Sequence, residues 1–278
     1  MIARIYNALL GGKDHYAYER LRVARLQAAV PDAAFVFRSE IAFLHRAARA
    51  VAARGITQWV VALAGLLPDN GDRLEHVVRR HNRDARVWYV DYEPVVLVHL
   101  RALVGDEDSG QTVRVVDADP LNPATVWNRL ASHPTPIEAD EPICLVLGGV
   151  LSYHPGTRAD AITVAQQHIA RLPPGSFVVL THLYDPEDPK ITPMVRRFRD
   201  ALGTCGPCRP ASATRDEIRA MVAGTTILPP APGAPPDVVP ANLWWRDGPI
   251  RLTPAGAEAP EPASGPLVAG VVATIDPG

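Results

Sequence analysis

Short apolar runs alternate with helical segments through the middle of the chain, and this alternation restricts the fold more than any other feature of the sequence. The runs are continuous rather than alternating in polarity, which is typical of strands covered on both faces of a parallel sheet. Segments with the apolar spacing of helices separate them, as βαβ units require. The sequence therefore predicts a doubly wound, Rossmann-like α/β sheet with strands at residues 59–64, 86–90, 112–116, 143–147 and 177–182.

The segments around these strands predict helices. The first fifty residues indicate helices, with Ser39 capping an apolar run that continues to Val51 and Gly55 following its end. Further helices are expected at residues 73–81, 94–103 and 157–172.

The C-terminal part has a different character. Prolines crowd residues 229–240 and 254–266, which predicts long loops. Residues 242–245 and 267–272 read as strands and predict an antiparallel pair at the edge of the sheet. We expect one compact domain overall, with an N-terminal helical cap at residues 1–54 and a Rossmann-like core at residues 55–278.

Charge and composition narrow the class of ligand. The chain carries 28 Lys and Arg against 30 Asp and Glu, a net charge of −2. This balance gives no electrostatic footprint for nucleic acid or an anionic membrane, so we expect neither as a partner. No apolar run is long enough to span a bilayer and no signal peptide is evident, which predicts a cytoplasmic location. The 3 cysteines, an odd number, argue against a disulfide framework.

Polar residues and glycines stand where the predicted strands end. Because parallel sheets bind ligands at the carboxyl ends of their strands, these residues are expected to converge in space. Asp91 ends the second strand and can accept hydrogen bonds from ribose hydroxyls, although a helix N-cap would use the same residue type. Asp119, with Asp117 as the less favoured neighbour, can accept from an adenine amino group or can form a turn before Pro120.

The loop after the first strand is less specific. It holds a single glycine, Gly65, where a nucleotide-binding turn usually has two or three. Gly65 could still permit a close approach of a ligand to the backbone.

At this point the chain resembles a known family. The stretch from Arg4 to Asp14, RIYNALLGGKD, is similar to the opening motif of the actinobacterial S-adenosylmethionine-dependent methyltransferases, long catalogued as a domain of unknown function. The similarity covers residues 3–185 clearly and the remainder loosely, and includes AFLHRA at 42–47, VDYEPVVL at 90–97, ADP at 118–120, GVL at 149–151, and the stretches PGSF and TH within 174–182.

The resemblance implies a class I methyltransferase fold, S-adenosylmethionine as cofactor, and transfer of a methyl group to a small molecule, for example in secondary metabolism. The chain departs from the family pattern at Val61 and Leu63 in the first loop and at Ser152. These departures keep two alternatives open: a non-methylating reaction such as a cyclisation, and a non-catalytic binding protein. A small-molecule substrate is the expected partner, and a homodimer is left open.

The predicted site has three parts. The expected cofactor-binding residues are Gly65, Asp91, Tyr92, Ala118, Asp119, Gly148 and Gly149. If the acceptor must lose a proton, the base is expected among Tyr153, His154 and His182, with His15 and Tyr16 as further candidates. The N-terminal segment is expected to form a lid over the pocket, through Tyr6, Gly11, Gly12, Lys13, Asp14, His15 and Tyr16.

Two motifs keep plainer interpretations beside the functional ones. The lid segment could instead be a helix–helix turn in which glycine ends one helix and Asp14 caps the next. Cys205 and Cys208 have the spacing of a redox or zinc motif, but no second Cys/His pair follows closely, so a surface loop is predicted. No metal site is expected.

Overall fold

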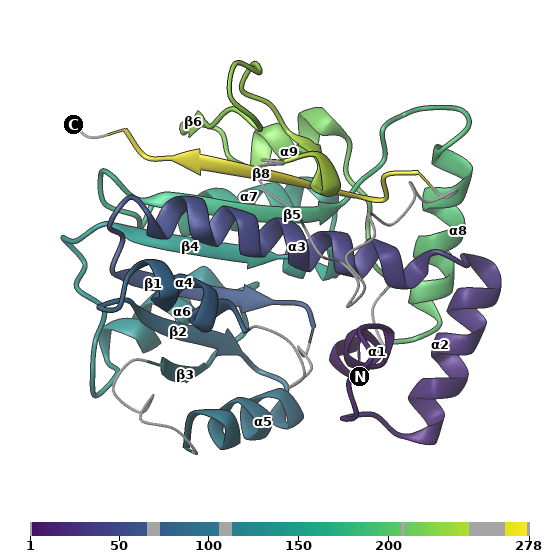
Figure 1. The fold of residues 1–278 in the computed structure, drawn as a ribbon, viewed down its shortest axis with the longest axis horizontal. Helices are drawn as coiled ribbons and strands as arrows, with labels where there is room; N and C mark the ends of the chain where they lie inside the picture. Colours follow the sequence, from purple (N-terminus) through teal and green to yellow (C-terminus); the bar gives the residue numbers. More distant parts are fainter. Residues whose placement is uncertain (1, 66–72, 106–112, 207–208, 245–264, 277–278) are drawn as a thin grey trace.

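The computed structural model describes residues 2–65, 73–105, 113–206, 209–244 and 265–276. A central sheet runs through the molecule in the order β3-β2-β1-β4-β5-β8-β6, with β7 also paired to β8 (Figure 1). The strands are β1 (Gln58–Leu63), β2 (Arg86–Asp91), β3 (Val113–Asp117), β4 (Ile143–Gly148), β5 (Phe177–Leu183), β6 (Thr226–Ile227), β7 (Val239–Pro240) and β8 (Val268–Thr274).

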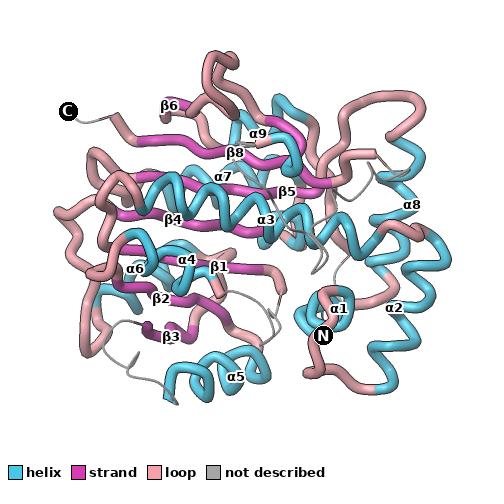
Figure 2. The backbone as a smooth tube through the Cα atoms, in the orientation of Figure 1, coloured by secondary structure: helices cyan, strands magenta, loops and turns pink. Residues whose placement is uncertain are grey.

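The helices lie on both faces of this sheet and beyond its carboxyl edge (Figure 2). They are α1 (Ile2–Leu9), α2 (Ala17–Ala29), α3 (Ala33–Ala52), α4 (Leu74–His81), α5 (Pro94–Gly105), α6 (Pro123–Ala131), α7 (Arg158–Ile169), α8 (Thr192–Gly203) and α9 (Arg215–Met221), with short 3-10 helices η2 (Val150–Tyr153) and η3 (Ala241–Leu243). Among the described residues, no helix is long and apolar enough to cross a membrane.

Strands β1 to β5 are parallel, and their sequences are continuously apolar because helices cover both faces of the sheet, as predicted. In β4, Cys144 and Val146 belong to the core under α3 and α4, whereas Leu145 and Leu147 belong to the core under α6 and α7. Both faces of the strand are therefore buried, so neither set of alternate side chains needs to be polar. The predicted Rossmann-like α/β fold, with a mostly parallel sheet flanked by helices, is confirmed.

The C-terminal edge of the sheet is antiparallel, but the strands that form it differ from those predicted. Strand β8 pairs with β5 on one side and with β6 and β7 on the other. The prediction of a partner strand at residues 242–245 is wrong for the residues described, because Ala241–Leu243 form the 3-10 helix η3. The buried Arg46 guanidinium donates to the carbonyl oxygens of Ala241 and Trp244, and these bonds stabilise the helical turn. Trp245 lies outside the described residues.

Helix α3 also begins earlier than predicted. Its N-cap is Asp32, so Ser39 lies inside the helix and does not cap it. The buried side chains of Val36 and Phe37 continue the apolar stripe toward the N-terminus, which keeps this segment packed and helical. The predicted boundary between cap and core follows α3, a helix that lies along the sheet, whereas α1 and α2 lie beyond the carboxyl ends of the strands (Figure 1). The division at residue 54 stays a prediction.

Candidate functional site

A pocket opens at the carboxyl ends of β1, β2 and β4, where the fold places ligands in sheets of this kind. The pocket is open to solvent, and its concave, mostly apolar wall is typical of a binding site for a small organic ligand. Its lining combines a few polar groups with a larger apolar surface, from Ile2, Ala3, Leu63, Ala64, Asp91, Tyr92, Glu93, Pro120, Leu121, Val150, Tyr153 and Gly206.

Asp91 is one of two acidic residues in the wall of this pocket, beside Glu93. It ends β2, and its Oδ1 accepts a hydrogen bond from the backbone N–H of Glu93 at 2.7 Å. Burial raises the pKa of Asp91 to about 6, while bonds from backbone N–H groups act in the opposite direction. The residue thus forms the turn before α5 and also lines the pocket, so the cap and ligand interpretations of this carboxylate are compatible.

The segment after β3 contributes apolar side chains to the pocket wall, and not the carboxylate of Asp119 that was predicted there. Asp119 Oδ1 accepts from the N–H of Leu121 at 2.8 Å, which is the turn role considered for it. Asp119 does not line the pocket, but the next two residues, Pro120 and Leu121, do. Ala118 is buried and donates its N–H to the carbonyl of Asp91 at 3.0 Å, which ties the two strand ends together.

The glycines at the strand ends accommodate neighbouring side chains. Gly149 has φ +71°, and a Cβ there would lie 2.8 Å from Oε1 of Glu40. A Cβ on Gly65 would overlap the ring of Tyr6, so the close approach predicted at Gly65 is made by a side chain of α1. Gly148 ends β4, packed against Leu63.

Glu40 forms a buried polar cluster behind the pocket with Tyr6 and Thr181. Its Oε1 accepts from the Thr181 hydroxyl at 2.6 Å, and its Oε2 from the Tyr6 hydroxyl at 3.4 Å. Burial raises the pKa of Glu40 to about 6, against the lowering effect of these two bonds. We did not predict Glu40 from the sequence, although a carboxylate on the apolar stripe of a helix was a usable signal.

The three predicted base candidates have different surroundings. Tyr153 lines the pocket, and its buried hydroxyl has no well-aligned hydrogen-bond partner among the described residues. Its proximity contributes to the raised pKa of Tyr6, whose largest cause is burial. His154 lies in a turn, where its Nδ1 accepts from the N–H of Gly156 at 3.0 Å. His182 does not line the pocket: it is buried on the α7 and α9 side of β5 and bonds the carbonyl of Leu183 at 2.8 Å. Burial lowers the pKa of His182 to about 4.

The N-terminal segment reaches the pocket through α1. Ile2 and Ala3 line it, whereas none of the residues from Gly11 to Tyr16 does. Gly11, with φ +81°, follows the end of α1, as the glycine pair predicts. Asp14 does not cap α2: its N–H donates to Oδ1 of Asn7 at 2.9 Å, and the N-cap position belongs to Tyr16.

The remaining parts of the lid segment and the cysteine motif are less informative. Lys13 and Tyr16 are exposed, while Gly12 and His15 are partly buried. Cys205 is buried, and the next residue, Gly206, lines the pocket, so this part of the motif is not a plain surface loop. Cys208 lies outside the described residues. Among the residues that the structure describes, no three His, Cys, Asp or Glu side chains are grouped to hold a metal ion.

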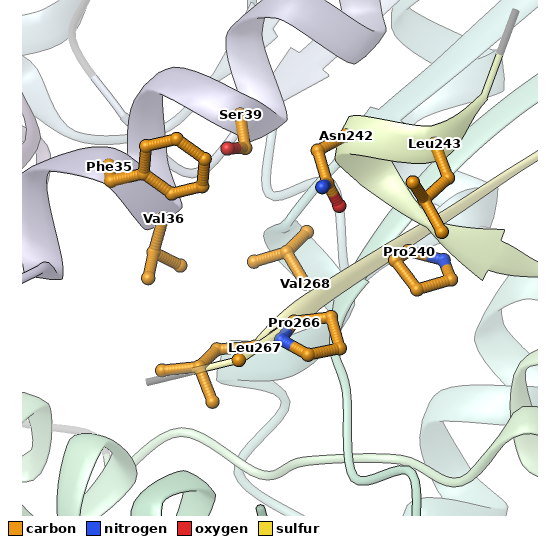
Figure 3. Close-up of a pocket in the computed structure, with 10 residues that line it drawn as sticks. Phe35, Val36, Ser39, Pro240, Asn242, Leu243, Pro266, Leu267 and Val268 are labelled. Atoms are coloured by element: carbon orange, nitrogen blue, oxygen red, sulfur yellow. The ribbon is translucent and has the colours of Figure 1, made fainter. Parts of the chain in front are cut away.

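A second pocket lies between α3 and the start of β8 (Figure 3). Phe35, Val36 and Ser39 face it from α3, and Pro240, Asn242, Leu243, Gly265, Pro266, Leu267 and Val268 complete its lining. This lining contains no acidic or basic side chain, so it offers no general acid or base.

The residues of the Asp91 pocket fit a nucleoside ligand. The carboxylate of Asp91 can accept hydrogen bonds from vicinal hydroxyls. Leu63, Pro120 and Leu121 supply apolar walls for a planar ring. These positions follow three neighbouring strands of the sheet, as the resemblance to class I methyltransferases implies.

Comparisons with known proteins agree with this geometry. A family model described as S-adenosyl methyltransferase matches residues 1–274. A structure described as a putative methyltransferase from Thermobifida fusca YX shares 26% identity and a TM-score of 0.80, covering 99% of this chain and 95% of that chain. A DUF574 family protein from Streptomyces avermitilis MA-4680 has the same fold, with 21% identity, a TM-score of 0.80, and coverage of 99% and 97%.

No functionally curated protein shows significant sequence similarity to the chain. The family match nevertheless spans almost the whole sequence, and it favours methyl transfer over a cyclisation or a purely binding role. On these grounds the chain belongs to the S-adenosyl methyltransferase family and is an enzyme that uses S-adenosylmethionine as its cofactor.

Proposed function

We propose that this methyltransferase acts on a small molecule, which binds beside the cofactor in the pocket at Asp91. The observation that carries the proposal is a pocket with a largely apolar lining and the desolvated carboxylate of Asp91 in its wall. Such a pocket suits small ligands, whereas a nucleic acid acceptor would call for a basic surface that the net charge of −2 does not favour.

In this proposal Asp91 binds the ribose hydroxyls of the cofactor, and Pro120 and Leu121 cover its adenine ring. Ala64 and Val150, which adjoin Gly65 and Gly149, form the floor near its amino-acid end. Tyr92 lines the nucleoside end, where Ala118 and Asp119 hold the backbone behind the pocket wall. When bound, S-adenosylmethionine supplies an electrophilic methyl group on a good leaving group. The protein then needs chiefly to hold the two ligands in line and to exclude water.

Tyr153 is the best placed of the three base candidates to touch the acceptor. Its ring lines the pocket, and its hydroxyl has not been taken up by a well-aligned bond within the described residues. His154 is engaged in a surface turn and His182 faces the opposite side of the sheet, so each would have to rearrange to reach the ligand. The cytoplasmic location remains a prediction, and a homodimer remains open.

Methyl transfer from labelled S-adenosylmethionine tests the proposal. The purified enzyme is incubated with fractions of a cell extract separated by size, and the label is followed into each fraction. We expect label in small molecules, and loss of this transfer in the Asp91→Asn variant. The matched control, Asp117→Asn, changes an exposed carboxylate at the end of the neighbouring strand and should transfer as the wild type does. Label that enters protein or nucleic acid alone would contradict the proposal.

A further inference from the structure

Among the residues that the structure describes, three glutamates are almost fully buried, and one of them differs from the other two. Glu19, Glu40 and Glu75 are each 3% exposed. Glu19 pairs with Arg4 at 3.3 Å, and Glu75 pairs with Arg73 at 2.5 Å. Glu40 forms no ion pair with any described residue, and hydroxyl groups alone contact its two oxygens.

A buried carboxylate without a cation is costly for a protein to keep. Removal from water disfavours the charged form, and two hydroxyl donors recover only part of the lost solvation. The raised pKa of Glu40, about 6, is the result of this imbalance. Groups of this kind gather at functional sites, where a ligand completes what the protein leaves unpaired.

Glu40 lies directly behind the wall of the Asp91 pocket. A Cβ placed on Gly149 would be 2.8 Å from Oε1 of Glu40 and 3.5 Å from Cβ of Ala64, so the carboxylate is one layer from a residue that lines the pocket. Two more lining residues, Val150 and Tyr153, belong to the 3-10 helix that follows Gly149. The hydroxyl of Tyr153 is also buried, and it has no well-aligned hydrogen-bond partner among the described residues.

We propose that Glu40 is the anionic counterpart of a cationic centre of the bound cofactor. This inference rests on the assignment of the Asp91 pocket to S-adenosylmethionine, which carries two cationic groups, a sulfonium and an ammonium. Glu40 and Asp91 would then bind opposite ends of one ligand, the first by charge and the second through ribose. Glu40 acts as a specificity-determining residue that favours the charged methyl donor over uncharged nucleosides.

The groups around Glu40 hold it in place without neutralising it. Tyr6 approaches from α1 and Thr181 from β5, and Tyr153 from η2 lies near Tyr6. The hydroxyls of Tyr6 and Thr181 donate hydrogen bonds to the carboxylate and so orient it. They carry no positive charge, so the negative charge of Glu40 can act through the thin wall formed by Gly149 and Ala64.

Three ligands separate the possible cationic partners in a calorimetric titration. S-adenosylmethionine has the sulfonium and the ammonium, S-adenosylhomocysteine has the ammonium alone, and 5′-methylthioadenosine has neither. All three carry the ribose that Asp91 would bind. We expect Glu40→Gln to weaken S-adenosylmethionine binding about tenfold, on the scale of one charge-assisted bond, and to leave 5′-methylthioadenosine within about twofold.

Glu75→Gln is the matched control, because it also converts a buried carboxylate to an amide but lies outside the pocket lining. It should leave all three affinities unchanged. With Glu40→Gln, a loss confined to S-adenosylmethionine identifies the sulfonium as partner, and an equal loss for S-adenosylhomocysteine identifies the ammonium. Unchanged affinities, or equal losses for all three ligands, would overturn the inference. If the wild type binds none of them, the cofactor assignment itself is at fault.

A pH series adds an independent readout. Asp91 also titrates near pH 6, but it contributes equally to all three ligands through ribose. The ratio of S-adenosylmethionine to 5′-methylthioadenosine affinity should therefore fall as the pH drops below about 6 in the wild type and stay flat in Glu40→Gln. A ratio with the same pH dependence in both proteins would count against Glu40.

Discussion

Replacing Gly149 by alanine tests the packing between the end of β4 and the Glu40 cluster. Gly149 has φ +71°, a conformation that costs an L-residue about 1–2 kcal/mol. The new methyl group would also lie 2.8 Å from Oε1 of Glu40 and 3.4 Å from the Tyr6 hydroxyl. Neither side chain can withdraw freely, because both are buried and bonded to each other.

A matched site in the same chain separates the two costs. Gly224 has φ +82°, but a Cβ there meets nothing within 4 Å. Gly224→Ala should therefore lower the free energy of unfolding by the backbone cost alone, about 1–2 kcal/mol. Gly149→Ala should lower it by about 2–5 kcal/mol, because overpacking a filled site adds about 1–3 kcal/mol to the backbone cost.

Urea unfolding monitored by circular dichroism measures the free energy of unfolding of both variants. A larger loss in Gly149→Ala than in Gly224→Ala, with unchanged denaturant slopes, is the expected result. Equal losses would show that Glu40 and Tyr6 do not fill the space beside Gly149, and the account of the cluster would fail.

Two further predictions follow from the buried side chains. Glu40→Gln should stabilise the ligand-free protein by up to about 2 kcal/mol at about pH 7.5. Folding raises the pKa of Glu40 from 4.5 to about 6, so ionisation of this side chain costs stability above that range. The gain should vanish near pH 4, and urea titrations that give the same gain at both pH values would refute the prediction. Cys205→Ser should lower the free energy of unfolding by about 1 kcal/mol, because the hydroxyl can keep the bond to the Ala201 carbonyl but enters an apolar core. Cofactor affinity should not change, and a loss of affinity in titration would give the cysteine motif a role in the pocket.

The sequence was most informative where one physical signal dominated. Continuous apolar strands such as Ile143–Gly148 could be recognised because burial on both faces leaves no polar alternation. The position of Asp91 followed from the strand that precedes it, since any residue at that point must lie at the carboxyl edge of the sheet. Capping rules were less reliable, because Asp32 rather than Ser39 caps α3 and Tyr16 rather than Asp14 is at the N-cap of α2.

Other features depended on contacts between segments far apart in the sequence. The helical turn at Ala241–Leu243 is held by Arg46, about 195 residues away, and no local pattern reveals that bond. Glu40 acquires its environment from Tyr6 and Thr181, which lie on separate elements. Gly65 illustrates the same limit, because its small size accommodates Tyr6 rather than leaving room for a ligand at that face.

Titration of the wild type and Asp91→Asn with S-adenosylhomocysteine tests the central claim most directly, because binding is measured without turnover. The account predicts a single site in the wild type and about 10- to 100-fold weaker binding in the variant, the equivalent of one or two charge-assisted bonds to ribose. Asp117→Asn, at the neighbouring strand end, should bind as the wild type does. Equal affinity in wild type and Asp91→Asn would contradict the assignment of this pocket to the cofactor.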